Sequence, residues 1–428
     1  MANLTLAQIA KILHWQGGVK DGAIENISTD SRTIKAGDLF IALSGDNFDG
    51  HNFAADVLAR GAAGAIVEHL VEGAPADRQI VVPDTEQAYL QIGGYIRNLS
   101  RAKVIAITGS AGKTTTKEMM KLVLSKFARV YATGENFNNA IGVAQTLCAM
   151  PEDAEIAIIE IGMSGAGMIK NRVQFVRPDI AIITNVYPMH LEFFDSVEGI
   201  ARAKAEIFSG LAPDGIALIN RDSDHFDILE AAAKARTSFI TTYGGNGARY
   251  YESNALCVLA VAKLLGFDMK KAERAAKEFE APEGRGKVHE LTLPGGKGSF
   301  RLINHSYSAQ PESLKLAIES LGQMKACRKI AVIGKMSEIG GKSRDMHVEI
   351  GKAIAGTDID IVIGVCQETK DILAQLGGKE THYFETSDGL DEYLLENVLR
   401  DGDAMLIKGS HYGSKLFRTA KSLIEKCG

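Results

Sequence analysis

The sequence predicts an α/β protein of three domains. The 428 residues are too many for one ordinary core and fit roughly two to four compact units, of which we expect three. Short β-branched runs alternate with helical stretches along most of the chain, as in parallel sheets covered on both faces. The stretch ITGSAGKTTTKEMM at 107–120 follows one such run and leads into a helical pattern. Strand, glycine loop and helix therefore occur in phosphate-binding order.

Composition excludes several classes of protein. A hydrophobic share of 46% and a charged share of 24% are those of an ordinary globular protein, which argues against extended disorder. The net charge of -5 argues against a general nucleic-acid binder, which needs a basic surface. The five cysteines form no C-x-x-C pair, so we expect buried thiols and neither a disulfide framework nor a zinc site.

The sequence contains no signal for membrane insertion. Its first residues lack a basic segment followed by a long apolar core, and no run reaches about 18 apolar residues. We therefore expect a location in the reducing cytoplasm.

The first predicted domain is a small α/β unit that covers residues 1–83. Apolar residues at helical spacing predict a helix within 4–14, and alternating residues predict short strands and turns within 23–43. The stretch 47–69 is typical of a loop, a helix and a buried strand. The stretch IVVPDT at 80–85 predicts a further strand before Pro83, and we place the boundary near residue 83.

The second predicted domain, residues 84–286, has a helix at 86–100, a buried strand at 103–109 and a helix that begins at the glycine loop. Three more apolar runs predict parallel strands, at 154–162, 179–186 and 215–220. Ligands of such sheets lie at the carboxyl ends of the strands. We expect a central parallel-sheet domain similar to P-loop ATPases.

The third predicted domain, residues 287–428, follows the turn-rich stretch APEGRGK at 281–287. Three further apolar runs alternate with helical patterns, at 328–334, 358–365 and 403–410. This alternation predicts a separate Rossmann-like unit.

The glycine loop is shorter than the usual P-loop. The pattern G-x-x-x-x-G-K-[ST] would need glycine at position 107, where this chain has Ile107. Backbone N–H groups of a glycine loop and a helix N-terminus still form an anion site, to which Lys113 adds a charge and Thr114 a hydroxyl able to bind Mg²⁺. A nucleoside triphosphate is the expected occupant. The alternative is a glycine turn without a ligand, which the flanking strand and helix disfavour.

Two further residues are candidate metal ligands. Magnesium bound to phosphates needs additional protein ligands, often at the ends of neighbouring strands. Glu160 closes an apolar strand, where a carboxylate is costly unless it meets a cation or hydrogen-bond donors. Metal ligation is favoured there over a structural salt bridge. His190 lies in a loop after another strand, where a lone histidine is more often a packing or capping residue than a ligand.

The motifs and their order resemble the Mur ligase family over about the whole chain, most strongly over 28–224. The stretch STDSRTIKAGDLFIALSGDNFDGHNF resembles that family's N-terminal domain, which binds uridine diphosphate. Five motifs resemble its central domain: ITGSAGKTTTKE, GENFNNAIGV, IIEIGMSG, ITNVYPMHLEFFDSVEGIARAKAEIF and LINRDSD.

The resemblance implies roles for individual residues. The implied ATP contacts are Gly109, Ser110, Ala111, Gly112, Lys113, Thr114, Thr115 and Arg285. The implied catalytic residues are Lys113, Glu160, His190 and Lys204, of which the last is carbamylated in the family. The implied Mg²⁺ ligands are Thr114, Glu160, His190 and the modified Lys204. The implied substrate contacts are Ser31, Arg32, Asp49, Gly50 and His51 for the nucleotide-sugar, and Asn136, Asn138 and Asn139 in the loop that faces the substrate.

The resemblance also implies an activity. It is greatest to the enzymes that join D-alanyl-D-alanine to UDP-N-acetylmuramoyl-tripeptide, with ATP and Mg²⁺, through an acyl phosphate in peptidoglycan precursor synthesis. We expect a cytoplasmic monomer that binds no nucleic acid. Two alternatives stay open: a family member with another acid or amine acceptor, and a nucleotide-binding regulator without ligase activity.

The chain departs from the family pattern mainly beyond the glycine-loop domain. The family's DSYNANP appears as HSYSAQP, with His305 in place of aspartate, which changes the residues that the resemblance would place at the ATP ribose and base. Tyr250-Tyr251 replaces a histidine and an asparagine, Lys335 an aspartate and His411 an arginine. The acceptor domain has therefore diverged more than the triphosphate site.

Overall fold

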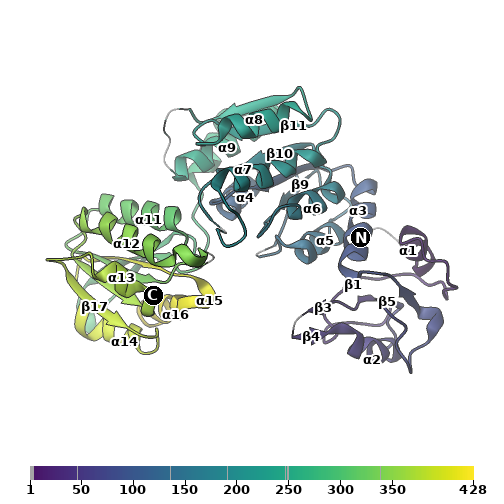
Figure 1. Ribbon diagram of the computed structural model, residues 1–428, viewed down its shortest axis with the longest axis horizontal. Helices are drawn as coiled ribbons and strands as arrows, with labels where there is room; N and C mark the ends of the chain where they lie inside the picture. Colours follow the sequence, from purple (N-terminus) through teal and green to yellow (C-terminus); the bar gives the residue numbers. More distant parts are fainter. Residues whose placement is uncertain are drawn as a thin grey trace.

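The computed structural model describes residues 4–45, 47–134, 136–189, 191–245, 247, 250–337 and 339–428. Figure 1 shows three α/β units in an open arc, with the central unit between the N-terminal and C-terminal ones. Each unit has its own sheet, with strands within 27–81, 103–243 and 287–408. The predicted fold class is confirmed. The domain limits at residues 83 and 286 stay predictions.

The N-terminal unit has a four-stranded parallel sheet in the order β1-β2-β5-β6 and a separate two-stranded hairpin of β3 and β4. Its elements are α1 (Leu6–Ile12), β1 (Ile27–Ser28), β2 (Leu39–Ile41), β3 (Ser44–Gly45), β4 (Phe48–Asp49), α2 (Ala54–Ala59), β5 (Gly64–Val67) and β6 (Gln79–Val81). The predicted N-terminal helix is confirmed, and a capping box between Thr5 and Gln8 fixes its start.

The central unit has a six-stranded parallel sheet in the order β12-β11-β10-β7-β9-β8. Its strands are β7 (Lys103–Thr108), β8 (Val130–Ala132), β9 (Ile156–Glu160), β10 (Ile180–Ile183), β11 (Ile216–Asn220) and β12 (Ile240–Tyr243). The four apolar strands expected from the sequence are confirmed. The sequence did not indicate β8 and β12, because these edge strands are short and mostly half-buried.

Helices cover both faces of the central sheet. The helices are α3 (Thr85–Leu99), α4 (Lys113–Leu124), α5 (Ala140–Cys148), α6 (Met168–Val176), α7 (Val197–Ala205), α8 (Phe226–Lys234), α9 (Tyr250–Leu264) and α10 (Met269–Lys277). Val104 and Ala106 of β7 pack with α3 and α5–α8, whereas Ile105 and Ile107 pack with α4, α9 and α10. Helix α3 also contacts α1 and β5, so one continuous core joins the N-terminal and central units.

The C-terminal unit has a six-stranded sheet in the order β13-β14-β18-β15-β16-β17. Its strands are β13 (Lys287–Thr292), β14 (Ser299–His305), β15 (Lys329–Gly334), β16 (Ile361–Val365), β17 (Glu380–Phe384) and β18 (Ala404–Lys408). Its helices are α11 (Pro311–Gln323), α12 (Ser343–Ala355), α13 (Lys370–Leu373), α14 (Leu390–Tyr393), α15 (His411–Ser414) and α16 (Leu416–Cys427). Strand β13 runs antiparallel to β14, which the sequence did not indicate, and the other neighbours are parallel.

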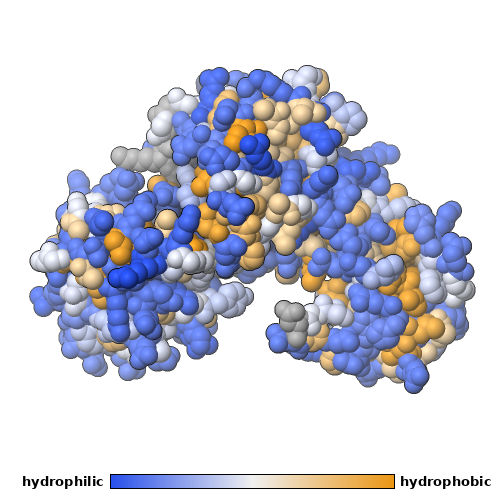
Figure 2. Space-filling model, viewed as in Figure 1, coloured by the Kyte–Doolittle hydropathy of each residue, from blue (hydrophilic) through white to orange (hydrophobic). Residues whose placement is uncertain are grey.

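The surface in Figure 2 is largely hydrophilic, and apolar side chains show along the N-terminal unit and in the hollow between the central and C-terminal units. No helix in the described part of the chain is long and apolar enough to cross a membrane.

A buried ion pair holds the start of two central strands of the C-terminal sheet. The side chain of Asp403 is fully buried and accepts hydrogen bonds from Arg328 at 3.0 and 2.6 Å and from the Arg400 N–H at 2.8 Å. Its carbonyl accepts from the Arg301 N–H of β14. The carboxylate therefore ties together the segments that enter β15 and β18, and the backbone carbonyl of the same residue joins them to β14.

Replacing this carboxylate should destabilise the C-terminal unit. We expect Asp403→Ala to lower the free energy of unfolding by about 3 kcal/mol, because it removes a fully buried carboxylate and leaves the partly buried Arg328 cation without its partner. Urea unfolding followed by circular dichroism measures the change. The control is Asp388→Ala, at an exposed position, for which we expect no change. Equal stability of both variants would contradict this role for Asp403.

Candidate functional site

The glycine loop joins the end of β7 to the start of α4. Gly112 has a φ of 77°, in the left-handed region that favours glycine. A side chain at Gly109 would collide with Thr184, which follows the neighbouring strand β10. The loop is therefore confined between two strand ends, which explains its glycines.

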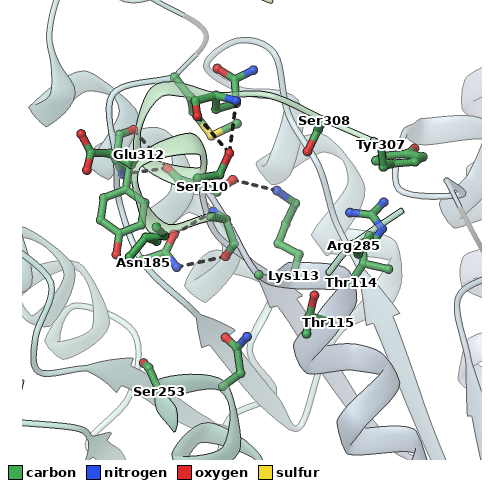
Figure 3. A pocket seen from close by; sticks show the side chains of 18 of the residues that line it. Ser110, Lys113, Thr114, Thr115, Asn185, Ser253, Arg285, Tyr307, Ser308 and Glu312 are labelled. Atoms are coloured by element: carbon green, nitrogen blue, oxygen red, sulfur yellow. Dashed lines mark hydrogen bonds between the residues drawn. The ribbon is translucent and has the colours of Figure 1, made fainter. Parts of the chain in front are cut away.

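Residues after β10 hold the loop in place, as Figure 3 shows. The N–H of Ser110 donates to the carbonyl of Asn185, and the N–H of Ala111 donates to the Asn185 Oδ1 at 2.7 Å. The Ser110 hydroxyl donates to the Tyr187 carbonyl and accepts from the Tyr187 N–H. Two loop amides are thus engaged within the protein. The donors that an anion can meet are the first-turn N–H groups of α4, which lack an intrahelical acceptor.

Lys113 and Thr114 open the helix and face a cavity. The Lys113 Nζ donates to the Gly109 carbonyl at 2.7 Å, so its half-buried ammonium lies over the loop. The Thr114 hydroxyl lies 2.9 Å from the nearer carboxylate oxygen of Glu160. Thr115 is buried and also lines the cavity. The predicted loop residues from Ser110 to Thr115 therefore line one cavity wall.

Glu160 is the last residue of β9 and is only 3% exposed. Its carboxylate accepts hydrogen bonds from the Thr114 hydroxyl and from the Asn138 Nδ2, the latter at 2.8 Å. The Lys117 Nζ lies 4.0 Å away, pairs with Glu118 at 2.8 Å and donates to a backbone carbonyl of the segment after β8. Groups on α4 and on the loop before α5 thus hold the carboxylate at the glycine loop.

The donor set fits Mg²⁺ in part. Thr114 and Glu160 offer adjacent oxygen atoms, which suit a hard cation. Among the described residues no group of three or more His, Cys, Asp or Glu side chains could hold a metal by itself. Further ligands, such as phosphate oxygens of a bound nucleotide or water, would have to complete the coordination. His190 lies outside the described residues.

Lys204 of α7 is a buried amine in the same cavity. Its side chain is 1% exposed and lines the cavity wall. None of the residues that the structure describes accepts a hydrogen bond from it. Burial, and then the charge of Lys113, lowers the pKa of Lys204 well below its ordinary value. Burial therefore disfavours the protonated form of this amine.

The C-terminal unit forms the opposite wall of this cavity, which has a volume of about 840 Å³. Arg285 stacks on the ring of Tyr307 at 3.9 Å, and the Tyr307 hydroxyl donates to Asn136 of the central unit. The predicted ATP contact Arg285 thus lies in the cavity lining, together with His305 and Lys408.

His305 and Lys408 are paired neighbours at the ends of β14 and β18. Burial, and then the charge of Arg285, lowers the pKa of Lys408 to about 7. Burial, and then the charge of Lys408, lowers the pKa of His305. Arg285, His305 and Lys408 therefore lie close enough to influence one another, and His305 stands where the family pattern has an aspartate.

The predicted nucleotide-sugar residues lie in the N-terminal unit, outside this cavity. His51 is buried, donates from Nδ1 to Asp49 at 2.6 Å and accepts at Nε2 from the Glu68 N–H at 2.8 Å. Its ring therefore positions Asp49. The exposed Arg32 pairs bidentately with Asp30.

The remaining predicted substrate residues have structural contacts within the protein. A side chain at Gly50 would lie 2.7 Å from the Leu43 carbonyl oxygen, so this position needs glycine. The Ser31 carbonyl accepts from Arg60, and Asn139 caps helix α5. Of the three asparagines, Asn138 and Asn139 line the cavity.

Sequence reasoning missed four residues of the site. Lys117 and Asn185 lie inside the motifs KTTTKE and TNV, but no spacing rule indicated that they buttress the loop. Arg172 of α6 is buried, donates to the Gly162 carbonyl and lines the cavity. Lys408 ends an apolar strand, as Glu160 does, and the same signal could have found it.

Three family models match consecutive parts of the chain. The Mur ligase family catalytic domain matches residues 23–110, the Mur ligase middle domain 107–277, and the Mur ligase glutamate ligase domain 291–411.

Curated relatives match along nearly the whole chain. The UDP-N-acetylmuramoyl-tripeptide–D-alanyl-D-alanine ligase of Rickettsia prowazekii is 33% identical, over 91% of this chain and 93% of its own. The enzymes of the same name from Bacillus subtilis and Escherichia coli are 33% and 30% identical, over 94% and 93% of this chain and 93% and 91% of their own.

Solved structures agree with these matches. A crystal structure of MurF from Acinetobacter baumannii is similar with a TM-score of 0.88 and 28% identity, over 99% of this chain and 100% of that one. The MurF ligase of Thermotoga maritima in complex with ADP has a TM-score of 0.81 and 25% identity, over 94% and 97%. With its three domains, its glycine loop and its relatives all in agreement, this chain belongs to the Mur ligase family.

Proposed function

We propose that the protein is an ATP-dependent ligase that adds D-alanyl-D-alanine to UDP-N-acetylmuramoyl-tripeptide in peptidoglycan precursor synthesis. One observation carries the proposal: the glycine loop of the central unit opens into a cavity whose other wall is the C-terminal unit. Such a cavity brings a phosphate donor and an amine acceptor together. The names of relatives that match over 91% to 94% of the chain supply the substrates.

The reaction needs an activated carboxylate. A carboxylate is a poor electrophile, so phosphoryl transfer from ATP first forms an acyl phosphate, which the acceptor amine then attacks with release of phosphate. Lys113 and the first-turn N–H groups of α4 hold the transferred phosphoryl group and stabilise its charge. The cavity walls exclude water from the acyl phosphate.

The metal ligands of this proposal are Thr114, Glu160, His190 and a carbamylated Lys204. Mg²⁺ bound there would neutralise charge on the phosphoryl oxygens. Asn138 and Thr114 orient the Glu160 carboxylate before any ligand binds. A cytoplasmic location and a monomeric state remain predictions.

The acceptor side supports a second candidate function, a family member that uses another acid or amine. Lys335 pairs with Glu368 at 3.3 Å, and His411 stacks on Phe417 at 4.2 Å, so both unusual residues have local partners in the C-terminal unit. A regulator without ligase activity is disfavoured, because a simple nucleotide binder has no need of Lys113, Glu160 and a buried Lys204 in one cavity.

One incubation tests the proposed function. The purified protein is mixed with ATP, Mg²⁺, UDP-N-acetylmuramoyl-tripeptide and D-alanyl-D-alanine, and the product is identified by mass spectrometry. We expect the pentapeptide product and phosphate release that requires both the nucleotide-peptide and the amine. Parallel reactions with other dipeptides and other third residues test the second candidate. Phosphate release that ignores both substrates would contradict ligation.

Lys113 is expected to be essential for turnover. We expect Lys113→Ala to lower kcat by at least about 100-fold, since charge stabilisation at the phosphoryl group is lost, while the thermal unfolding temperature stays unchanged. The control is Lys121→Ala, an exposed lysine on the same helix. Equal turnover of the Lys113 variant and the parent would remove ATP chemistry from this loop.

Arg32 is expected to serve the nucleotide-sugar. Its guanidinium is 86% exposed and can leave Asp30 to bind a diphosphate bidentately. Arg32→Ala should therefore raise the KM for the nucleotide-peptide and leave the KM for ATP unchanged, in contrast to the control Lys11→Ala on the same unit. A selective rise of the KM for ATP would assign Arg32 elsewhere.

Lys204 is expected to carry a carbamate. Burial and the nearby Lys113 lower the pKa of its amine and so favour the neutral form, which is the form that reacts with CO₂. The product is an anion with oxygen atoms suited to Mg²⁺. In protein equilibrated with carbon-13 bicarbonate, we expect an NMR carbamate signal that is absent in Lys204→Ala and retained in the exposed control Lys170→Ala. A parent spectrum without this signal, together with full activity of Lys204→Ala, would overturn the assignment.

A further inference from the structure

A second buried amine faces the cavity from the C-terminal unit. Lys408 is the last residue of β18 and is only 2% exposed. Its side chain lines the cavity, and its Nζ donates to the carbonyl of Ser308 at 2.9 Å. Figure 3 shows Ser308 across the cavity from the loop that carries Ser110 and Lys113. Lys408 therefore lies on the wall opposite the phosphate loop.

Among the residues that the structure describes, none next to Lys408 in the sheet carries a negative charge. The adjacent residues on β14 and β15 are His305 and Ile333. The charge that shifts its pKa is that of Arg285. On the other face of β18, α16 packs through the apolar residue Leu416.

Two acidic residues of the surrounding segments are paired with other lysines. Glu312, in the first turn of α11, binds Lys315 at 2.8 Å. Glu368 binds Lys335, which follows β15. Among the described residues, the carbonyl of Ser308 is the one acceptor found for the Lys408 amine.

This environment favours the neutral amine. Burial, followed by the repulsion from Arg285, lowers the pKa of Lys408 to about 7. Near neutral pH a large fraction of the side chain thus has a free lone pair. A base is most effective when its pKa lies near the working pH.

The proposed ligation has a step that needs such a base. The acceptor amine enters as an ammonium ion, which has no lone pair and cannot attack a carbonyl. We propose that Lys408 accepts the proton of the incoming acceptor ammonium. The assignment rests on the proposed function, because it presumes an acyl phosphate and an amine acceptor. Lys113 and Lys204 lie at the phosphate loop and serve the other half of the reaction.

The step balances without any further reactant. The acceptor R–NH₃⁺ gives one proton to the Lys408 amine, which becomes an ammonium. The free nitrogen lone pair forms the C–N bond at the acyl carbon, and the C–O bond to phosphate then breaks. The leaving phosphate takes the second nitrogen proton and departs as HPO₄²⁻. Lys408 afterwards returns its proton to solvent.

The rival role for Lys408 is a charged anchor for an anionic group, such as the carboxylate of the acceptor. Two substitutions separate the roles. Lys408→Arg keeps a positive charge but cannot release a proton at neutral pH, whereas Lys408→Met keeps the volume and removes both functions. The matched control is Lys329→Arg, a buried lysine at the opposite end of the same sheet, outside the cavity lining.

The experiment compares two acceptors. D-alanyl-D-alanine requires deprotonation, whereas hydroxylamine is largely neutral at pH 7 and attacks an acyl phosphate directly to give a hydroxamate. We expect both Lys408 variants to lose at least about 100-fold in kcat with the dipeptide and to form hydroxamate at the parental rate. The control variant should behave as the parent with both acceptors. ADP binding and thermal unfolding confirm that the variants are folded.

The pH profile of the parent supplies a second readout, which needs no variant. With saturating dipeptide, kcat should rise with pH up to about 7 and then level off, because only neutral Lys408 accepts a proton. With hydroxylamine this limb should be absent. A rise of kcat centred near pH 8, where α-amino groups titrate, would reflect deprotonation of the acceptor itself and contradict the assignment.

Other outcomes are equally decisive. Full activity of Lys408→Arg, with a raised dipeptide KM in Lys408→Met, would establish the anchor role and overturn the proposal. A parallel loss of peptide and hydroxamate would place Lys408 before the acyl phosphate, which also overturns it. A parent that forms neither product would refute the proposed function itself, and this result is distinct from the others.

Discussion

The contact between Thr114 and Glu160 is the interaction on which the site depends. It joins the first turn of α4 to the end of β9, so the phosphate loop and the sheet edge share one geometry. A carboxylate that is only 3% exposed would be costly alone. Asn138 donates to it, and the buried Lys117 lies 4.0 Å away, so the protein stabilises this charge in the absence of a ligand. The carboxylate is thereby preorganised for the cation that a nucleotide brings.

Two buried amines line the cavity. Burying a lysine amine lowers the free energy of unfolding, because its charged form loses hydration. Lys204 lies at the phosphate loop, and Lys408 lies on the opposite wall. A pKa lowered from 10.5 to about 7 at Lys408 corresponds to about 5 kcal/mol. The unfolded chain binds this proton below pH 10.5, whereas the folded chain binds it only below about 7. The cost is therefore full at and below pH 7 and vanishes as the pH rises towards 10.5.

The three units are joined in two different ways. A continuous apolar core through α3 connects the N-terminal sheet to the central one, because Tyr89, Leu90 and their neighbours are buried between them. The C-terminal unit has separate cores and touches the central unit through polar groups, such as Tyr307 on Asn136. Polar contacts of this kind can be exchanged with little loss of buried area. The wall that the C-terminal unit forms is thus the part of the cavity best able to move towards the phosphate loop.

The sequence by itself determined the fold class, the four apolar strands of the central sheet and the order of loop, strand and helix, because these depend on local periodicity and on glycine. It also singled out Glu160, since a charge that ends an apolar strand is visible in one dimension. It could not show that β13 is antiparallel to β14 or that Asn185 accepts hydrogen bonds from two loop amides. Nor could it show that both ring nitrogens of His51 are hydrogen-bonded, one to Asp49 and one to the Glu68 N–H. Those facts depend on contacts between distant segments. Only the tertiary structure decided that no carboxylate in the described part of the chain pairs with Lys408, because the pKa of a buried group is set by what surrounds it in space.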